Sequence, residues 1–209
     1  MEHPHEKEAW RSFSERKRVP AVWRGSTTGF TGENVDGWVV SHRVRLAILA
    51  AESEIVDAKV YQVLQYGDSG DYLRTYLLQH DAMGPSLEDT GALDHQMVLD
   101  VDGNSWSSRL PKLLWSDALV LRASTFANFM DGYMLKAYEH YIPVRLDFSD
   151  LEDKVRWALA NPDEVRRIRA NVRRDFPPTQ EALYEYMVCY GQQLLLEYAC
   201  LVYDHCECE

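Results

Sequence analysis

The sequence predicts an α/β fold in which helices flank a mostly parallel sheet. Short apolar runs of strand length alternate along the chain with segments whose apolar residues recur at helical spacing. The stretches between them are dense in glycine, aspartate, serine or proline, which is typical of loops. Strands that alternate with helices form parallel sheets. We therefore expect the Rossmann-like class, whose ligands bind beyond the carboxyl ends of the strands.

The strands are predicted from β-prone or continuously apolar runs. The clearest is QMVLDV, residues 96–101, because an unbroken apolar run that stops at Asp102-Gly103 is typical of a strand buried on both faces. The expected strands, in chain order, are residues 19–23, 55–60, 96–101, 118–121 and 141–146. The Gly-, Asp-, Ser- and Pro-rich residues 67–71 and 84–94 are predicted to be loops.

The first helices are predicted from periodicity. In residues 41–51, Val44, Ile48 and Ala51 fall on one face at helical spacing. Residues 107–115 and 128–138 are also expected to be helical.

Three helices are predicted to close the chain. Ser149 and Glu152 have the spacing of a capping box at the start of the first. Asn161-Pro162 begins the second, because proline is favoured in the first turn of a helix. Pro177-Pro178 ends it, and a long helix is expected from residue 179 to about residue 203.

Composition indicates one globular domain. Of the 209 residues, 46% are hydrophobic and 11% aromatic, which is enough for a core and unlike a disordered chain. We expect a Rossmann-like domain over residues 19–203, a polar N-terminal segment over residues 1–18 and a tail over residues 204–209. The net charge of −11 argues against nucleic-acid binding, which requires a basic face.

No targeting or membrane signal is visible in the sequence. Residues 1–18 are charged throughout, with no apolar region of a signal peptide, and no run of 18 apolar residues predicts a membrane span. The tail contains His205, Cys206 and Cys208, which are candidate ligands of a soft metal. An exposed tail without a metal is the favoured interpretation, and these cysteines do not predict the compartment.

The first candidate ligand-binding motif is WRGSTTG, residues 23–29. Glycine allows the backbone to approach an anion, hydroxyls donate hydrogen bonds, and a guanidinium offers a rigid fork of donors. Arg24, Gly25 and Ser26 are therefore candidates for binding a phosphate, together with Arg43 on the following helix. The alternative is a turn with a surface arginine.

The second candidate motif lies between a buried strand and a helix. Backbone N–H groups in such a turn point toward a phosphate, and serine hydroxyls add donors. The candidate residues are Asp102, Gly103, Asn104, Ser105, Ser107, Ser108 and Arg109, with Arg109 placed to neutralise a diphosphate. The alternative is a serine-rich helix cap.

Other reactive residues give weaker signals. Asp100 and Asp102 have the spacing of a metal-binding pair, but Asp100 lies within an apolar strand, so a structural role is favoured. His140 is expected to be a hydrogen-bonded histidine at the entrance of a strand. No nucleophile motif is present and the sequence singles out no general base, so the catalytic residues stay unassigned.

Four ordered segments resemble glycosyltransferase family 90, the capsule-associated-protein type that includes protein O-glucosyltransferases and fungal xylosyltransferases. The segments are WRGSTTG with SHRVRL (residues 23–29 and 41–46), LDVDGN with SSRLPKLL (99–104 and 107–114), HYIPV (140–144), and residues 147–157. Each segment is weak alone, but their order is specific, and together they extend over nearly the whole chain.

The resemblance implies a two-domain GT-B enzyme that uses a UDP-sugar without a metal, and this chain is similar to its C-terminal, UDP-binding half. Arg24, Gly25, Ser26 and Arg43 would lie at the nucleotide-sugar. Residues 102–109 would cradle the diphosphate, with Arg109 offsetting the charge of the leaving UDP. No cofactor or metal is then expected, and the partners would be the UDP-sugar and a protein or glycan acceptor.

Two functions follow from this resemblance. The first is a glycosyltransferase, or its donor-binding half, that moves a sugar such as glucose or xylose to a hydroxyl. The second is a non-catalytic UDP-binding remnant or interaction protein. Only 22 residues precede Trp23, too few for the family's acceptor half, and the family's Glu-aromatic pair has no clear counterpart among residues 127–129. Family members act in the lumen of the ER or Golgi, so a longer protein containing this chain would be expected there.

Overall fold

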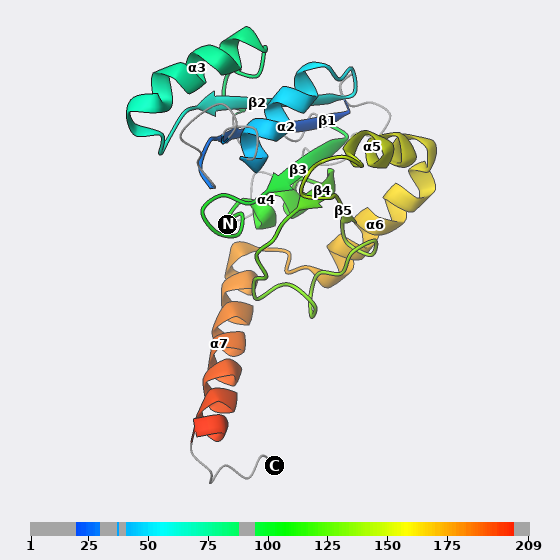
Figure 1. Ribbon diagram of the computed structural model, residues 1–209. Coiled ribbons are helices and arrows are strands. Elements are labelled where there is room, and N and C mark those ends of the chain that lie inside the picture. Colours follow the sequence, from blue (N-terminus) through cyan, green and yellow to red (C-terminus); the bar gives the residue numbers. More distant parts are fainter. Residues whose placement is uncertain (1–19, 30–36, 38–40, 88–94, 203–209) are drawn as a thin grey trace.

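The computed structural model describes residues 20–29, 37, 41–87 and 95–202, and these form a parallel five-stranded sheet flanked by helices (Figure 1). The strand order is β2-β1-β3-β4-β5, and every neighbouring pair is parallel. The strands are β1 (Ala21–Ser26), β2 (Val56–Gln62), β3 (Met97–Val101), β4 (Leu119–Ala123) and β5 (Ile142–Pro143). The predicted α/β class is confirmed.

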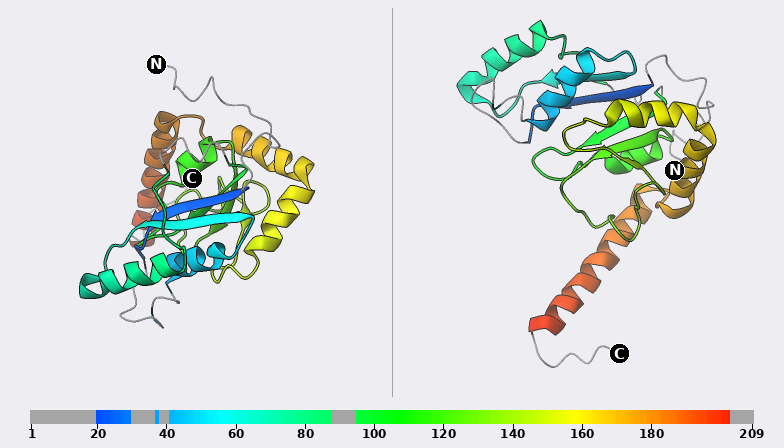
Figure 2. Two further views of the ribbon diagram at one scale, coloured as in Figure 1. Left: turned by 90° about the horizontal axis from the view of Figure 1, so that it is seen from above. Right: turned by 45° about the vertical axis from the view of Figure 1, so that its right-hand side comes forward.

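Helices cover both faces of the sheet (Figures 1 and 2). The elements are α2 (His42–Ala51), the short 3₁₀ turn η3 (Gly67–Ser69), α3 (Gly70–Gln79), α4 (Leu110–Trp115), α5 (Leu151–Ala160), α6 (Pro162–Asp175) and α7 (Gln180–Val202). One core joins α2, α3, α5 and part of α6 to the sheet. A second core joins α4 and the first turns of α7 to the opposite face.

Burial on both faces explains the apolar strands. In β3, Leu99 contributes to the first core while Val98 contributes to the second, because successive side chains point to opposite faces. All five residues of β3 and all five of β4 are buried. A strand covered on both sides needs apolar residues throughout, so the continuous runs at residues 96–101 and 118–121 predicted these strands correctly.

Residues 128–138 do not form the predicted helix, and this prediction was wrong. The backbone N–H of Asn128 donates to the Asp131 carboxylate at 2.9 Å, and that of Met130 donates to the Asn128 side chain at 2.9 Å. Gly132 and Tyr138 adopt positive φ angles of 85° and 62°. Side-chain acceptors therefore capture backbone donors locally, and the left-handed residues prevent a continuous helix.

Several boundaries also differ from the prediction. Residues 67–71, predicted as a loop, begin η3 and α3, and α3 buries Leu73 and Leu77 one turn apart. The first strand extends through Ser26, so residues 24–26 belong to β1 rather than to the turn after it. Helix α4 begins only at Leu110, and the last strand is limited to Ile142–Pro143.

The closing helices were predicted closely, apart from one cap. Helices α5, α6 and α7 lie where periodicity placed them, with Pro162 in the first turn of α6. The capping box is absent, because Glu152 accepts hydrogen bonds from the side chains of Ser53 and Arg156 instead. Asp150, rather than Ser149, is the residue that precedes α5.

Helix α7 projects from the domain as a single long rod (Figures 1 and 2). Of its 23 residues only Leu183 is buried. No helix in the described part of the chain is long and apolar enough to cross a membrane. Residues 1–18 and 204–209, for which we predicted a polar segment and a tail, lie outside the described residues.

Candidate functional site

The two predicted motifs meet at the carboxyl edge of the sheet. The backbone N–H of Gly29, in the loop after β1, donates to the side-chain oxygen of Asn104, in the loop after β3, at 2.9 Å. The two loops are in close contact, since a Cβ built on Gly29 would lie 3.1 Å from the carbonyl oxygen of Gly103. The two motifs therefore converge, as their positions after parallel strands implied. We call the part of the carboxyl edge where these two loops meet the rim.

Arg43 joins these loops from helix α2. It is buried, and its Nε donates to the backbone oxygen of Asp102 at 2.7 Å. Nη1 donates to the backbone oxygen of Ser26 at 3.1 Å and to the Thr28 hydroxyl at 2.7 Å, and Nη2 donates to the backbone oxygen of Val101 at 3.1 Å. The guanidinium thus connects the carboxyl ends of β1 and β3 through four hydrogen bonds.

Arg109 approaches the same place from the other face of the sheet. It precedes the first turn of α4, and its Nη1 donates to the backbone oxygen of Arg24 at 2.5 Å. Its Nη2 is buried without a hydrogen-bond partner among the described residues. A buried guanidinium nitrogen with unused donors is costly unless a ligand accepts from it.

The two arginines place two positive charges at this rim. Burial lowers the pKa of Arg43 to about 10, and the charge of Arg109 acts in the same direction. Burial also lowers the pKa of Arg109, which the Asp100 carboxylate opposes. Both guanidinium groups stay charged at neutral pH, so the rim is suited to an anion.

Arg24 does not present its side chain to this rim. Its guanidinium donates to the Asp57 carboxylate at 2.7 Å and to the backbone oxygen of Asp57 at 2.9 Å. Only the main chain of Arg24 contacts the rim, through its carbonyl oxygen and Arg109. The two residues are therefore neighbours, but the Arg24 guanidinium holds β1 to β2.

The Asp102 carboxylate organises a third loop, which the sequence did not single out. The Ser124 hydroxyl donates to both of its oxygens at 2.9 Å, and the backbone N–H groups of Thr125 and Phe126 donate to Oδ2 at 2.7 and 3.2 Å. Asp102 thus fixes the chain after β4 at the same edge of the sheet. Ser124, a hydroxyl residue directly after a buried strand, was the sequence signal that could have identified this loop.

Asp100 belongs to a buried charge cluster rather than to a pair with Asp102. Its carboxylate lies 3.5 Å from Nε of Arg122, which also bonds the Asp131 carboxylate. Burial raises the pKa of Asp100, while the Ser107 hydroxyl and Arg122 act in the opposite direction. Among the described residues no group of three or more His, Cys, Asp or Glu is placed to hold a metal. His205, Cys206 and Cys208 lie outside them.

The remaining predicted residues divide by exposure. Asn104, Ser105 and Ser108 are exposed, and Ser26 and Ser107 are buried. Gly25 is packed against the Trp23 indole, where a Cβ would lie 2.3 Å from a ring carbon. Gly25 therefore serves the packing of β1.

Sequence reasoning missed three residues that hold the loops. The Thr27 hydroxyl, fully buried, donates to the backbone oxygen of Leu64 and accepts from its N–H, both at 2.8 Å. His42 Nε2 lies 2.6 Å from the backbone oxygen of Asp102, and Thr28 accepts from Arg43. All three belong to the segments WRGSTTG and SHRVRL, but their hydrogen bonds depend on which strands become neighbours in the sheet.

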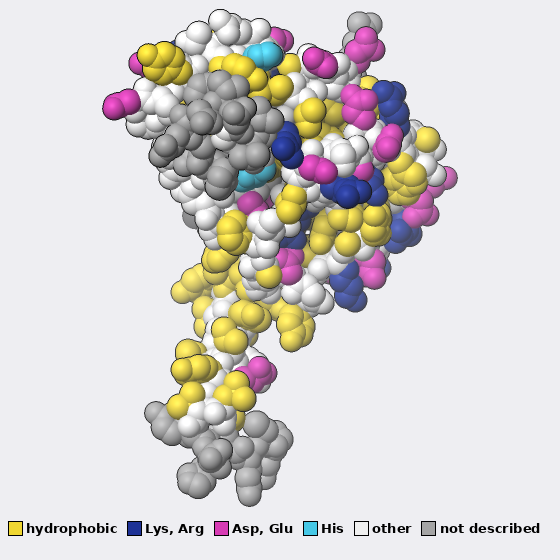
Figure 3. Space-filling view, in the orientation of Figure 1, with side chains coloured by type: hydrophobic (Ala, Val, Ile, Leu, Met, Phe, Trp, Pro, Cys, Tyr) yellow, Lys and Arg dark blue, Asp and Glu magenta, His cyan; other side chains and the backbone are white. Residues whose placement is uncertain are grey.

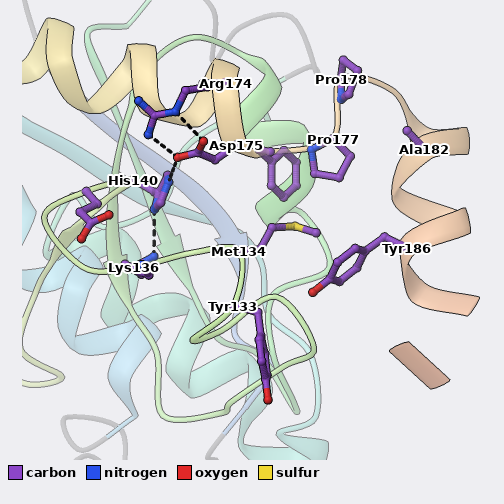
Figure 4. A pocket seen from close by; sticks show the side chains of 12 residues that line it. Tyr133, Met134, Lys136, His140, Arg174, Asp175, Pro177, Pro178, Ala182 and Tyr186 are labelled. Atoms are coloured by element: carbon purple, nitrogen blue, oxygen red, sulfur yellow. Dashed lines mark hydrogen bonds and ion pairs between the residues drawn. The ribbon is translucent and has the colours of Figure 1, made fainter. Parts of the chain in front are cut away.

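A separate pocket of about 650 Å³ involves none of these loop residues (Figure 4). It is lined by the β4–β5 connection and by the junction of α6 and α7. His140 accepts from the backbone N–H of Lys136 at 3.0 Å through Nδ1, so Nε2 carries the proton toward Asp175 at 3.0 Å. The expectation of a hydrogen-bonded His140 is confirmed. Arg174 and His140 hold the pKa of Asp175 well below its usual value.

Comparison with known proteins identifies the family. The sequence model of the family described as glycosyl transferase family 90 matches residues 2–207, nearly the whole chain. The chain belongs to glycosyl transferase family 90.

Two relatives illustrate how far the likeness extends. Protein O-glucosyltransferase 3 of Homo sapiens is 33% identical over 109 residues, covering 50% of this chain and 20% of that protein. Protein O-glucosyltransferase 2 of Danio rerio is 30% identical over 131 residues, covering 59% of this chain and 25% of that protein. The matched region therefore amounts to a fifth to a quarter of the length of these two relatives.

Solved structures show the same fold. The sucrose-phosphate synthase of Thermosynechococcus elongatus has a TM-score of 0.50 at 12% identity, covering 85% of this chain and 46% of that one. TarM has a TM-score of 0.53 at 10% identity, covering 84% of this chain and 35% of that one. The family 90 chain thus has the fold of a GT-B glycosyltransferase C-terminal domain, as the resemblance implied.

Proposed function

We propose that the carboxyl edge of the sheet binds the diphosphate of a UDP-sugar. The chain is then the donor-binding half of a glycosyltransferase that moves a sugar such as glucose or xylose to a hydroxyl of a protein or glycan. The observation that carries this proposal is Nη2 of Arg109, a buried guanidinium nitrogen with no hydrogen-bond partner among the described residues, where two glycine-containing loops meet. A diphosphate oxygen is an acceptor suited to it.

Each part of the rim has a role in this proposal. The Arg109 guanidinium offsets the charge that grows on UDP as the bond to the sugar breaks, which lowers the barrier to its departure. The exposed side chains of Asn104, Ser105 and Ser108 are donors for the remaining phosphate oxygens. Arg43 contributes its positive charge and fixes the loops, because its donors already bond the protein.

A second candidate function is UDP binding without sugar transfer. It is favoured because the carboxylates of Asp57, Asp100 and Asp102 are engaged in contacts within the protein. Asp102 accepts from the chain after β4, Asp57 accepts from Arg24, and Asp100 lies against Arg122. A carboxylate held in such contacts is a poor general base, so transfer to an acceptor hydroxyl would require a different one.

Calorimetric titration with UDP tests the binding site. We expect Arg109→Ala to weaken UDP binding by roughly 10- to 150-fold, equivalent to about 1.5–3 kcal/mol for hydrogen bonds to a charged group. The matched control is Arg166→Ala, which removes an exposed arginine from α6 and should leave the affinity unchanged. If Arg109→Ala unfolds in the same thermal transition as the wild-type chain and binds UDP with unchanged affinity, Arg109 does not belong to a UDP site.

Turnover distinguishes the two candidate functions. UDP release from UDP-glucose or UDP-xylose is measured with a hydroxyl-bearing peptide or glycan acceptor. Transfer that Arg109→Ala abolishes supports the glycosyltransferase. Binding of UDP without transfer supports the non-catalytic alternative, and absence of UDP binding by the wild-type chain rejects both.

A further inference from the structure

Two aromatic side chains are exposed in loops at the carboxyl edge of the sheet. Hydrophobic side chains on the surface gather along helix α7 (Figure 3). Outside that helix, the exposed aromatic side chains of the described residues are Tyr61, Tyr72, Trp106, Phe126, Tyr133, Tyr138 and Trp157. Trp106, 50% exposed, belongs to the loop after β3, and Phe126, 43% exposed, to the chain after β4. Aromatic rings beside a few polar groups are typical of ligand-binding surfaces.

Phe126 is held beside the rim by Asp102. The backbone N–H of Phe126 donates to Oδ2 of Asp102 at 3.2 Å, and the Ser124 hydroxyl lies 3.1 Å from the carbonyl oxygen of Phe126. The backbone oxygen of Asp102 in turn accepts from Nε of Arg43 at 2.7 Å. The main chain of Phe126 is thus connected to the Arg43 guanidinium through a single residue.

Trp106 belongs to the loop that leads to Arg109. The backbone N–H of Gly103 donates to the carbonyl oxygen of Ser105 at 3.0 Å, which closes a bend directly before Trp106. Ser107, directly after it, is buried. The exposed indole therefore lies between two held neighbours, three residues before the arginine whose Nη2 has no hydrogen-bond partner among the described residues.

The covalent structure of a nucleotide-sugar assigns the two sides of the rim. Its diphosphate lies between the nucleoside and the sugar, so the nucleoside extends to one side of Arg109 and the sugar to the other. The rim lies where β1 and β3 end, with β2 on one side and β4 on the other. The loops after β3 and β4 offer two exposed rings, whereas in the described part of the chain β2 offers Tyr61. A nucleobase stacks on aromatic rings because every base has a π-face.

We propose that Trp106 and Phe126 form the surface that binds the nucleobase of the donor, on the β4 side of the rim. We call these two residues the nucleobase surface. Stacking removes water from two half-exposed rings and from the faces of the base, which favours binding. The sugar then extends toward the β2 side. This inference rests on the proposed diphosphate site and adds the part of the donor that an arginine does not recognise.

Calorimetric titration of the chain with UDP and with inorganic pyrophosphate tests the nucleobase surface. We expect Trp106→Ala and Phe126→Ala each to weaken UDP binding by roughly 5- to 50-fold, equivalent to about 1–2.3 kcal/mol. Pyrophosphate has no base, so its affinity should stay unchanged in both variants. Trp106→Phe keeps an aromatic ring and should retain most of the UDP affinity.

Tyr133→Ala is the matched control. Tyr133 is an 80% exposed ring further along the same β4–β5 connection, where it lines the separate pocket (Figure 4). Its removal should change the affinity for neither ligand. Arg109→Ala serves as the reference for the diphosphate site and should weaken both ligands. Thermal denaturation checks that each variant remains folded.

The fluorescence of Trp106 gives a second readout that needs no destabilising variant. UDP should quench tryptophan emission of the wild-type chain, pyrophosphate should not, and the quenching should disappear in Trp106→Phe. Quenching that is unchanged in Trp106→Phe contradicts stacking on this ring.

The outcomes separate this inference from the proposed function. If Arg109→Ala weakens UDP binding while both aromatic variants bind UDP normally, the diphosphate site stands and the nucleobase surface is rejected. An equal loss of UDP and pyrophosphate affinity in the aromatic variants would mean that the rings only hold the loops, and it also rejects the surface. A wild-type chain that binds neither ligand overturns the donor site and the nucleobase surface together.

Discussion

Nε of Arg43 donates to the backbone oxygen of Asp102 at 2.7 Å, and this bond joins two parts of the chain 59 residues apart. Asp102 in turn binds the loop after β4 through its carboxylate. Arg43 from α2 and Asp102, the residue directly after β3, therefore fix the ends of three neighbouring strands. These bonds hold the loops together without a ligand, which should reduce the entropy lost on binding.

Replacing Arg43 should separate the loops. Arg43→Ala removes the guanidinium donor from the backbone oxygens of Ser26 and Val101 and leaves that of Asp102 with His42 alone, so we expect a loss of about 3 kcal/mol in the free energy of unfolding. Urea denaturation measures it. The exposed Arg166 pairs with Asp163, three residues earlier on the same helix, and Arg166→Ala should cost about 0.5 kcal/mol. Equal losses in the two variants would show that Arg43 does not hold the rim.

The contact between the two loops requires glycine at position 29. Gly29 has a φ of 114°, and a Cβ there would lie 2.7 Å from a ring carbon of His42. We expect Gly29→Ala to cost about 1–3 kcal/mol of stability through backbone strain and to weaken UDP binding. Gly191, in the middle of α7, has open space around its Cβ position. Gly191→Ala should instead stabilise the fold by about 0.5–1 kcal/mol, and thermal denaturation of both variants tests the contrast.

Thr27 fixes the position of the first loop against the end of β2. Thr27→Val keeps the shape but removes both hydrogen bonds to Leu64, so we expect a loss of about 1–2 kcal/mol in unfolding free energy. Thr75 on α3 is exposed and bonds only the backbone oxygen of Asp71. Thr75→Val serves as the control and should change stability by less than about 0.5 kcal/mol. A neutral Thr27→Val would mean that water replaces the hydroxyl.

The strands, and the meeting of the two motifs at one edge of the sheet, were predictable because they depend on local patterns. The apolar runs of β3 and β4 identify buried strands, and parallel strands bring their carboxyl ends to one edge. That reasoning placed residues 23–29 and 102–109 together. It did not predict which side chains face the rim, because the partner of Arg24 is Asp57 on a neighbouring strand.

The errors share a physical cause. Residues 128–138 have helical spacing, but Asp131 pairs with Arg122 and accepts from the N–H of Asn128, which fixes a turn. The predicted capping box fails because Glu152 bonds Ser53, a residue 99 positions away. In both cases a specific side-chain hydrogen bond decides the local structure, close in sequence for Asp131 and distant for Glu152, and sequence periodicity contains no information about either.

Acidification should destabilise the fold through His42. Burial lowers the pKa of His42 from 6.5, so the folded state binds a proton less readily than the unfolded state does. Stability from this group is therefore complete above pH 6.5 and is lost as the pH falls below that value toward the lowered pKa. His42→Gln preserves a donor for the backbone oxygen of Asp102 but has no titrating group. We expect unfolding free energies at pH 7.5 and 5.5 to differ more for the wild-type chain than for His42→Gln. An equal difference would assign the acid sensitivity in this range to other groups.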